Sequence, residues 1–282
     1  MAEILKGKPV ADQLQAELVA KVAGLRERGL EPHLAVLLVG SDPASEVYMN
    51  RKKKTGEKLG FIVSTHVLPG DSSTQAVLAK LEQLNADPSV HGILVEQPLP
   101  DQVDKELIVN TLAPAKDVDG ANPLNLGRLV GGDESFVPAT AQAVIEMLER
   151  NNVPLKGRRA VVVGRSTIVG KPAALLLLNR HATVTVCHSR TADLAAVTRE
   201  AEILVAAVGR AELITAEMVS PGAVVIDVGT NVVDDKLVGD VAFEGVAAKA
   251  AAITPVPGGV GPLTNMLVLR NTAAACERLA TR

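Results

Sequence analysis

Aromatic residues, cysteines and long apolar runs are scarce in this sequence, and each scarcity argues against a class of protein. Three Phe, one Tyr and no Trp among 282 residues leave little on which a single-stranded nucleic acid could stack. The two cysteines, Cys187 and Cys276, are too far apart in the sequence to form a disulfide framework or a zinc ribbon. The five histidines lack close ligand spacing, so we expect no metal site.

Neither sign of charge dominates. Lys and Arg number 29 against 32 for Asp and Glu, a net charge of −3, which argues against general binding to nucleic acid. No window approaches 18 uncharged apolar residues, so we expect no membrane span. The first residues are charged and lack the apolar stretch of a signal peptide, so we expect a cytoplasmic protein.

Strand-like and helix-like segments alternate along the whole chain, which predicts an α/β fold with two domains. We expect a first domain over residues 1–140, with a C-terminal helix over 262–282 packing back on it. Residues 141–261 contain four near-continuous apolar runs, namely 158–164, 182–188, 202–209 and 223–229. Runs without polar alternation are typical of parallel strands buried on both faces. They predict a Rossmann-like, doubly wound parallel sheet in the second domain.

Gly164 and Gly170 flank a predicted turn between a strand and a helix, in the pattern G-x-S-x-x-x-G. A small first residue permits such a turn, and the helix start then offers N–H groups to a pyrophosphate. A glycine turn after a buried strand is also common without any ligand. The end of the next strand favours the nucleotide, because Ser189 and Arg190 stand where NAD-binding units carry an acid. With Arg165 in the first turn, these residues suit a 2′-phosphate and therefore NADP.

Tyr48 and Lys52 are four residues apart on a predicted helix and therefore share one face. Lys52 belongs to a run of four cations, which is either a solvated surface or a means of favouring the neutral amine that proton transfer requires. Tyr48 offers a flat face to a planar ring, although a single tyrosine can equally serve packing.

Three further stretches carry candidate site residues. The apolar run over 92–100 ends in prolines, which places Glu96 or Gln97 at the edge of a sheet. Asp117 and Asp119 lie in a turn-rich loop, where an aspartate either closes an Asx turn or accepts paired N–H bonds from a heterocycle. The segment over 254–264 combines three prolines with several glycines, so it is rigid and allows close backbone approach.

These motifs together resemble the bifunctional methylenetetrahydrofolate dehydrogenase/methenyltetrahydrofolate cyclohydrolase family. The resemblance runs in order across nearly the whole chain and rests on SEVYMNRKKK, GILVEQPLP, PAKDVDG, VVVGRSTIVGKP, TVTVCHSRT, VIDVGTN, LVGDVAFE and TPVPGGVGPLT. It implies NADP-dependent oxidation of 5,10-methylenetetrahydrofolate and hydrolysis of the methenyl product to 10-formyltetrahydrofolate. It also implies a role in one-carbon metabolism and purine biosynthesis, and a homodimer of two-domain chains with the active site in a cleft between the two domains.

The resemblance assigns roles to particular residues. It implies that Tyr48 stacks on the folate, that Lys52 is the general acid and base, and that Asp119 holds the amino edge of the pterin. It places further contacts with the substrate in the proline-glycine segment, at Pro257, Gly258 and Gly259. The contacts with NADP that it implies are Gly164, Arg165, Ser166, Ser189 and Thr230.

Glu96 departs from the family pattern, which usually reads V-Q-L-P-L-P where this chain has V-E-Q-P-L-P. An ionised Glu96 near Lys52 favours the charged amine and stabilises the cationic methenyl bridge, so we expect weakened hydrolysis. A protonated Glu96 would instead mimic glutamine. Gln97 should not substitute, because adjacent side chains of a strand point to opposite faces. Ala139 and Ala141 stand where the family has a cysteine and a second proline.

Two alternatives remain at this level. One is a methylenetetrahydrofolate dehydrogenase with little cyclohydrolase activity, which separate assays on the two folates would distinguish. The other is a non-catalytic NADP-binding module, which would bind the nucleotide without turnover; the joint presence of Tyr48, Lys52 and Asp119 argues against it.

We predict that the substitution Arg165→Ala lowers the preference for NADP over NAD. The guanidinium is assigned to the 2′-phosphate, which NAD lacks, so its loss should weaken NADP binding selectively. Measuring kcat/KM with each nucleotide tests the assignment. An unchanged ratio of the two values would show that Arg165 does not read the 2′-phosphate.

Overall fold

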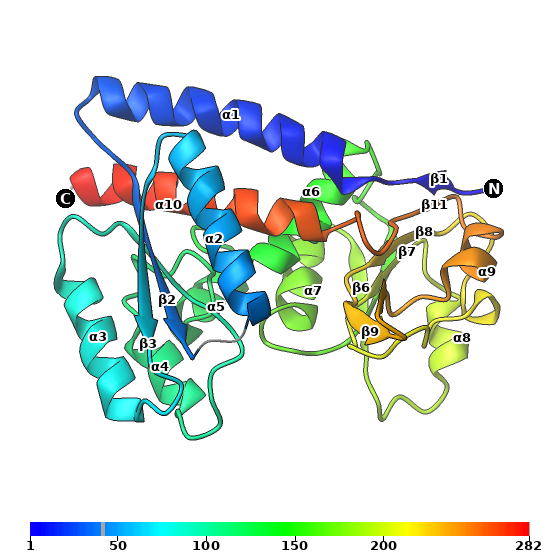
Figure 1. Cartoon of the computed structure of the whole chain (residues 1–282). Coiled ribbons are helices and arrows are strands. Elements are labelled where there is room, and N and C mark those ends of the chain that lie inside the picture. Colours follow the sequence, from blue (N-terminus) through cyan, green and yellow to red (C-terminus); the bar gives the residue numbers. More distant parts are fainter. Residues whose placement is uncertain (41–42, 282) are drawn as a thin grey trace. The chain divides into compact units, whose positions relative to one another are not determined.

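The computed structural model describes residues 1–40 and 43–281, without the side chains of residues 43–45, 47 and 48. The chain divides into two compact units (Figure 1). One comprises Met1–Gln13 and Pro138–Thr264, and the other comprises Leu14–Val137 and Asn265–Arg282. We call them the six-stranded unit and the three-stranded unit after their main sheets. The α/β class with a parallel sheet is confirmed.

The six-stranded unit is built on a parallel sheet with the strand order β1-β11-β8-β7-β5-β6. Its strands are β1 (Glu3–Ile4), β5 (Arg159–Val163), β6 (Thr183–Cys187), β7 (Ile203–Ala206), β8 (Val224–Asp227) and β11 (Ala252–Ile253). A two-stranded antiparallel hairpin, β9 (Asn231–Val233) and β10 (Lys236–Val238), follows β8. The first thirteen residues group with this unit because β1 pairs with β11, whereas the sequence analysis placed them in the first domain.

Helices cover both faces of this sheet, as doubly wound folds require. The helices are α6 (Ala139–Arg150), α7 (Gly170–Asn179), α8 (Leu194–Thr198), α9 (Phe243–Ala247) and the 3-10 turn η1 (Ala216–Met218). The helix α7 packs on β5 and β6, and α6 packs on α7. Side chains of α8 and α9 instead join a core cluster with alternate residues of β5, β7 and β8.

The strand β6 differs from its expected burial. It is the last strand of the sheet order, and four of its five residues are partly or fully exposed; Val186 is 41% exposed. An apolar run of β-branched residues indicates a strand but does not distinguish a central strand from an edge strand. The prediction of burial on both faces therefore holds for β7 and is wrong for β6.

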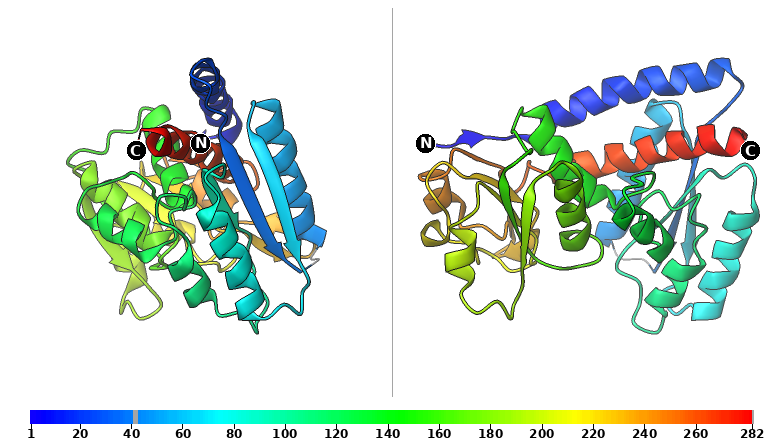
Figure 2. Two further views of the ribbon diagram at one scale, coloured as in Figure 1. Left: turned by 90° about the vertical axis from the view of Figure 1, so that its left-hand side faces the viewer. Right: turned by 180° about the vertical axis from the view of Figure 1, so that it is seen from behind.

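The three-stranded unit contains a parallel sheet of order β3-β2-β4. Its strands are β2 (His33–Val39), β3 (Ile62–Leu68) and β4 (Gly92–Val95). Its helices are α2 (Pro43–Lys58), α3 (Thr74–Ala86), α4 (Lys105–Thr111) and α5 (Pro123–Val130). Both α1 (Gly7–Glu27) and α10 (Gly261–Ala280) contribute residues to this unit. The left view of Figure 2 shows α2 and α3 on opposite sides of the sheet.

The central strand β2 explains this arrangement. All of its residues except His33 are buried, because β3 and β4 flank it and helices cover both faces. Its alternate residues Ala35, Leu37 and Val39 join the cluster formed by α3 and α4. The two short helices α4 and α5 flank the loop of Asp117 and Asp119, and the sequence analysis predicted neither of them. Their amides are capped by Asp104 and Asn122, a signal that was present in the sequence.

Among the described residues, no helix is both long enough and apolar enough to cross a bilayer. The same part of the chain contains no group of three or more His, Cys, Asp or Glu side chains able to hold a metal ion.

Three partly buried histidines lie close to one another in the three-stranded unit. The Nε2 atoms of His33 and His66 lie 2.8 and 3.1 Å from Ser64 Oγ, and His91 Nδ1 accepts the backbone N–H of His33. Burial lowers the pKa of all three rings from 6.5. The charges of His33 and Lys116 add to the effect at His91, whereas at His33 the carbonyl of Ser89 and the charge of Asp87 oppose it. The native state therefore binds fewer protons here than the unfolded chain.

We predict that the free energy of unfolding falls as the pH is lowered through 6.5. Because the folded pKa values lie below the unfolded value, the contribution is fully present above pH 6.5 and is lost as the rings become charged. Urea unfolding at several pH values between about 7.5 and 5 measures the slope of the free energy of unfolding against pH.

The variant His33→Gln removes one titrating group and should reduce that slope. His181→Asn is the matched control, because His181 is exposed and has a positive φ that asparagine accepts. A slope in His33→Gln equal to that of the control would contradict the assignment.

Candidate functional site

The candidate catalytic lysine is held in an ion pair within the three-stranded unit. Lys52 Nζ donates to both carboxylate oxygens of Glu96, at 2.5 and 2.8 Å. The Lys52 side chain is 17% exposed and that of Glu96 is 10% exposed, so solvent screens the pair little. The structure therefore brings together two of the residues that the sequence singled out.

The ends of β4 and α2 create this contact. Glu96 follows β4 directly, and its N–H donates to the carbonyl of Leu37 on the central strand at 2.9 Å. The next residue, Gln97, is exposed, as the alternation of an extended segment requires. Gln97 therefore does not take the place of Glu96 beside the lysine.

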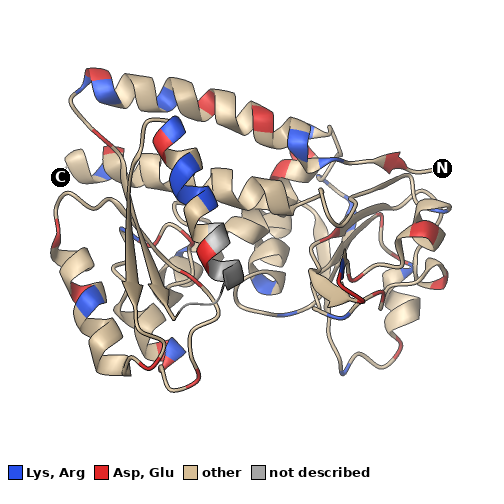
Figure 3. Cartoon of the chain, in the orientation of Figure 1, with Lys and Arg blue, Asp and Glu red and all other residues tan. Residues whose placement is uncertain are grey.

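The cationic run on α2 divides according to the helix face. Arg51 and Lys54 are exposed, whereas Lys52 and Lys53 are partly buried. Figure 3 shows these cations along α2. The solvated-surface interpretation applies to Arg51 and Lys54, whereas Lys52 is engaged by Glu96. Tyr48 lies on the same helix, but its side chain is outside the described part of the structure.

The loop that carries Asp119 is shaped by the buried carboxylate of Asp117. Asp117 accepts the N–H groups of Ala121 and Asn122 at 3.2 and 2.8 Å, and the side-chain amide of Asn125 at 2.9 Å. Burial raises the pKa of Asp117 from 3.8, while these hydrogen bonds oppose the rise. Asp117, which is 0% exposed, therefore closes the loop through N–H groups four and five residues further on, a longer span than that of an Asx turn.

Asp119 is partly exposed, in contrast to Asp117. The residue between them, Val118, is fixed because its carbonyl accepts the side-chain amide of Asn271 on α10 at 2.8 Å. Asn271 is buried and was not recognised from the sequence. A polar residue on the apolar face of a predicted helix was the available signal. The loop thus presents Asp119 from a rigid support.

The turn between Gly164 and Gly170, which the sequence analysis assigned to a nucleotide, follows β5 in the six-stranded unit. Gly164 has φ +126°, and a Cβ there would lie 2.1 Å from the carbonyl oxygen of Ala207. A Cβ on Gly170 would lie 2.2 Å from the carbonyl oxygen of Gly164. Both glycines are therefore required by close backbone approach and, at Gly164, by a left-handed conformation.

Ser166 closes this turn. Its Oγ accepts the N–H groups of Val169 and Gly170 at 3.2 and 3.3 Å. It thereby caps the start of α7 and takes two N–H groups that the sequence analysis had expected to face a ligand. Arg165, which stands between Gly164 and Ser166, is exposed.

Ser189 and Arg190 follow the neighbouring strand and are also exposed. The N–H of Gly164 donates to the carbonyl of Cys187 at 2.9 Å, so the segments after β5 and β6 leave the sheet at the same edge. Hydroxyls and cations gather there, with no acidic residue in 164–170 or 187–191. This composition fits a dinucleotide that carries an additional phosphate.

Thr230 lies at the same edge, in the loop after β8, and is exposed. The last residue of β8, Asp227, is 3% exposed. Burial raises the pKa of Asp227 to about 6, and the charge of Asp240 contributes, while hydrogen bonds from backbone N–H groups oppose the rise. Two buried carboxylates therefore lie beside this loop, and the sequence analysis missed both.

The proline-glycine segment follows β11. Pro257 and Gly258 are exposed and Gly259 is buried. The carbonyl of Gly258 accepts the N–H of Gly7 at 2.8 Å, and a Cβ on Gly7 would lie 1.8 Å from the carbonyl oxygen of Gly259. The start of α1 thus supports the segment in a fixed position.

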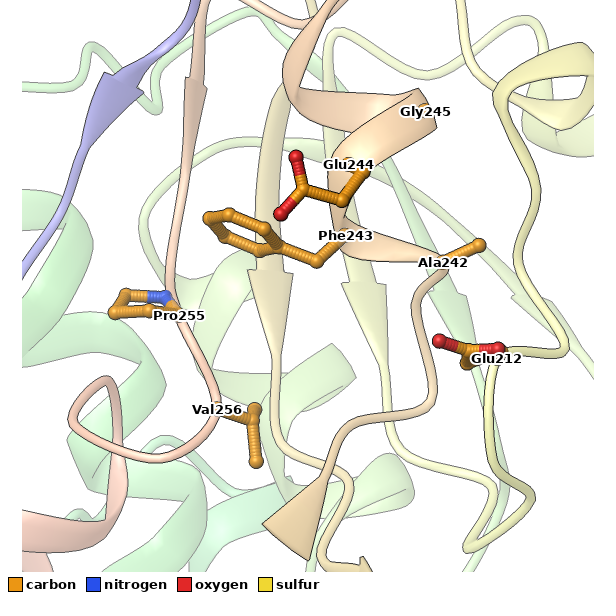
Figure 4. A pocket seen from close by; sticks show the side chains of 7 residues that line it. All are labelled: Glu212, Ala242, Phe243, Glu244, Gly245, Pro255 and Val256. Atoms are coloured by element: carbon orange, nitrogen blue, oxygen red, sulfur yellow. The ribbon is translucent and has the colours of Figure 1, made fainter. Parts of the chain in front are cut away.

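A cavity of about 380 Å³ lies beside this segment, between α9 and the chain that follows β11 (Figure 4). Its lining residues are Glu212, Ala242, Phe243, Glu244, Gly245, Pro255 and Val256. None of the predicted site residues lines it, so the candidate site is identified by its polar groups and backbone geometry.

Comparison with family models gives two matches that follow one another along the chain. The catalytic-domain model of tetrahydrofolate dehydrogenase/cyclohydrolase matches residues 5–119. The NAD(P)-binding-domain model of the same family matches residues 138–280.

Individual relatives extend over almost the full length. The bifunctional protein FolD of Moorella thermoacetica is 53% identical over 98% of this chain and 99% of its own. The crystal structure of the bifunctional FolD enzyme of Campylobacter jejuni matches with a TM-score of 0.95 at 43% identity, covering 99% of both chains. The Trypanosoma brucei enzyme, solved with NADP cofactor and inhibitor, matches with a TM-score of 0.94 at 39% identity, covering 100% of this chain and 99% of its own. On this agreement of sequence and structure, the protein belongs to the tetrahydrofolate dehydrogenase/cyclohydrolase family.

Proposed function

We propose that this protein oxidises 5,10-methylenetetrahydrofolate with NADP and hydrolyses the resulting 5,10-methenyltetrahydrofolate to 10-formyltetrahydrofolate. The observation that carries the proposal is the match of both family models, in order and over nearly the whole chain. Relatives described as bifunctional at about half identity favour two activities over a dehydrogenase alone. The family resemblance supports the supply of one-carbon units, including those used in purine biosynthesis.

The nucleotide is assigned to the edge where β5, β6 and β8 end. Gly164 and Ser166 shape the turn, Arg165 and Ser189 are assigned to the 2′-phosphate, and Thr230 is assigned to the cofactor from the neighbouring loop. The left-handed Gly164 and the exposed Arg165 support these roles. When bound, NADP supplies the acceptor for the hydride. The residues of the chain bind and orient, which is most of what hydride transfer requires.

The folate is assigned to Tyr48, Asp119 and the segment Pro257, Gly258 and Gly259. Asp119 offers carboxylate oxygens to the N–H groups at the amino edge of the pterin, and its rigid loop makes that contact directional. Backbone groups around Gly258 allow close approach of a flat ring because no side chain projects there.

Hydrolysis depends on Lys52. Water must lose a proton as it attacks the cationic methenyl carbon, and a ring nitrogen must gain one as the bridge opens. In this chain the amine is already hydrogen-bonded to both oxygens of Glu96. Its nitrogen must leave this contact, or transfer a proton to it, before it accepts one from water. The carboxylate also stabilises the cationic substrate and thereby slows the attack of water.

A homodimer in the cytoplasm completes the proposal, on the support of the family resemblance. Light scattering coupled to size-exclusion chromatography measures the mass, for which twice the 29.4 kDa of one chain is expected.

A coupled absorbance assay tests the central proposal. With 5,10-methylenetetrahydrofolate as substrate, we expect reduction of NADP and a higher kcat/KM for NADP than for NAD. With 5,10-methenyltetrahydrofolate, we expect loss of its absorbance faster than in buffer alone. Absence of the first reaction refutes the dehydrogenase, and absence of the second leaves a dehydrogenase only.

We predict that Glu96→Gln raises the cyclohydrolase rate severalfold, because a neutral amide favours the charged amine of Lys52 less than a carboxylate does. The neutral amide keeps a hydrogen bond to Lys52 and removes the negative charge. Dehydrogenase activity should change much less, because it depends on positioning. Both rates are measured on the same protein preparation.

Glu277→Gln is the matched control, because it also removes a carboxylate from ion pairs, with Lys21 and Arg28. It is expected to alter neither activity. If hydrolysis in Glu96→Gln stays at the wild-type rate, the electrostatic argument about Glu96 is wrong even when the enzyme is bifunctional.

A further inference from the structure

Asp240 is a fully buried carboxylate among the loops at one edge of the six-stranded sheet. Its side chain accepts four hydrogen bonds. Val208 N and Gly209 N donate to Oδ2 at 2.6 and 3.0 Å. Arg210 N and Asn231 Nδ2 donate to Oδ1 at 2.8 and 3.0 Å. These bonds fill the acceptor positions of a carboxylate, so Asp240 ties the loop after β7 to the beginning of β9.

Asp227 connects Asp240 to the end of β8. Asp227 Oδ1 accepts the N–H groups of Gly229 and Asp240, both at 2.9 Å. Its Oδ2 accepts the N–H of Val241 at 3.0 Å. One carboxylate therefore holds the backbone that carries the other, and neither can shift alone.

Two glycines leave the space that this arrangement occupies. A Cβ on Gly229 would lie 2.3 Å from the Asp240 carboxylate, and a Cβ on Gly239 would lie 1.8 Å from Asp227 Oδ2. The backbone thus approaches both carboxylates more closely than any other residue type would allow.

The loops held in this way are those of the proposed nucleotide site. Thr230 stands between Gly229, which is bound by Asp227, and Asn231, which is bound by Asp240. Ala207 precedes the amides bound by Asp240. Its carbonyl oxygen lies so close to Gly164 that a Cβ on Gly164 would not fit. Asp240 therefore holds the segments after β7 and β8, and the segment after β5 packs against the first of these.

We propose that Asp240 is the positioning residue of the nucleotide site: by holding the loops after β7 and β8 in a fixed conformation, it lets the dinucleotide bind without ordering them. The inference rests on the proposed NADP site. Loops that are ordered beforehand spare the entropy cost that binding would otherwise include. Asp240 itself needs no contact with the nucleotide.

The variant Asp240→Asn tests this role. One oxygen becomes an NH2 group, which then faces the donors of Arg210 and Asn231. We expect the dissociation constant for NADP, measured by titration calorimetry, to rise roughly tenfold, the equivalent of about 1.4 kcal/mol. The KM for 5,10-methylenetetrahydrofolate should remain within about twofold, because the direct substrate contacts are retained.

A reciprocal exchange identifies the contact itself. Asn231→Asp alone sets two carboxylates against each other and should also weaken NADP binding. The double variant Asp240→Asn/Asn231→Asp restores a donor facing an acceptor, so it should bind NADP more tightly than either single variant. Recovery should be partial, because the N–H of Arg210 still lacks its acceptor.

Thr198→Val is the control for lost stability in the same unit. Thr198 is the last residue of α8, the helix that precedes β7. It is buried, and its hydroxyl donates to the carbonyl of Leu194 at 3.0 Å. It should lower the thermal midpoint and leave the dissociation constant for NADP unchanged. If Asp240→Asn fails to fold, Asn231→Ala removes one of the four donors and should raise that constant by about threefold.

Wild-type NADP affinity in a folded Asp240→Asn variant, or no recovery in the double variant, overturns the inference. If Asp240→Asn does not fold, wild-type NADP affinity in Asn231→Ala also overturns the inference. Because the readout is binding of NADP, it is independent of turnover. Wild-type protein that binds NADP but does not oxidise the folate would refute the proposed function while the role of Asp240 remained testable.

Discussion

Buried carboxylates that accept backbone N–H groups shape the loops on which the proposed site depends. Loop amides cannot all pair with a neighbouring strand, and a buried amide without a partner is costly. Asp117 meets this need in the three-stranded unit, and Asp227 and Asp240 meet it in the six-stranded unit. Each carboxylate is buried and lies close to an exposed or partly exposed residue assigned to a ligand. Rigid support and accessible chemistry are therefore provided by different residues.

The Lys52–Glu96 pair is a different kind of interaction, because both of its members are assigned to the chemistry. Two opposite charges with little exposure gain from each other only when their geometry is good, and here one amine meets both oxygens. The same contact that stabilises the pair reduces the availability of the amine to water. A glutamine in place of Glu96 would keep a hydrogen bond to Lys52 without binding the amine as a charged partner. The balance between the two proposed activities therefore depends on whether residue 96 carries a carboxylate oxygen or an NH2 group.

Sequence periodicity was sufficient for most elements of the fold. The apolar runs over 158–164, 182–188, 202–209 and 223–229 became the parallel strands β5, β6, β7 and β8. The short helices α4 and α5 were missed because their apolar stripes are too brief for a helical period to emerge. The exposure of β6 was missed because the strand order of a sheet is decided by contacts between distant segments.

The sequence by itself determined the family, the α/β class and the candidate residues, because these follow from the order of residue types along the chain. It also determined that Glu96 and Gln97 face opposite ways, since alternation is a property of any extended backbone. Only the tertiary structure decided that Lys52 contacts Glu96, that Asp117 supports the loop while Asp119 is accessible, and that Asp240 connects the loop after β7 to the beginning of β9. Lys52 and Glu96 are 44 positions apart and Asp240 and Arg210 are 30 apart, so these two contacts exist only after the strands have paired.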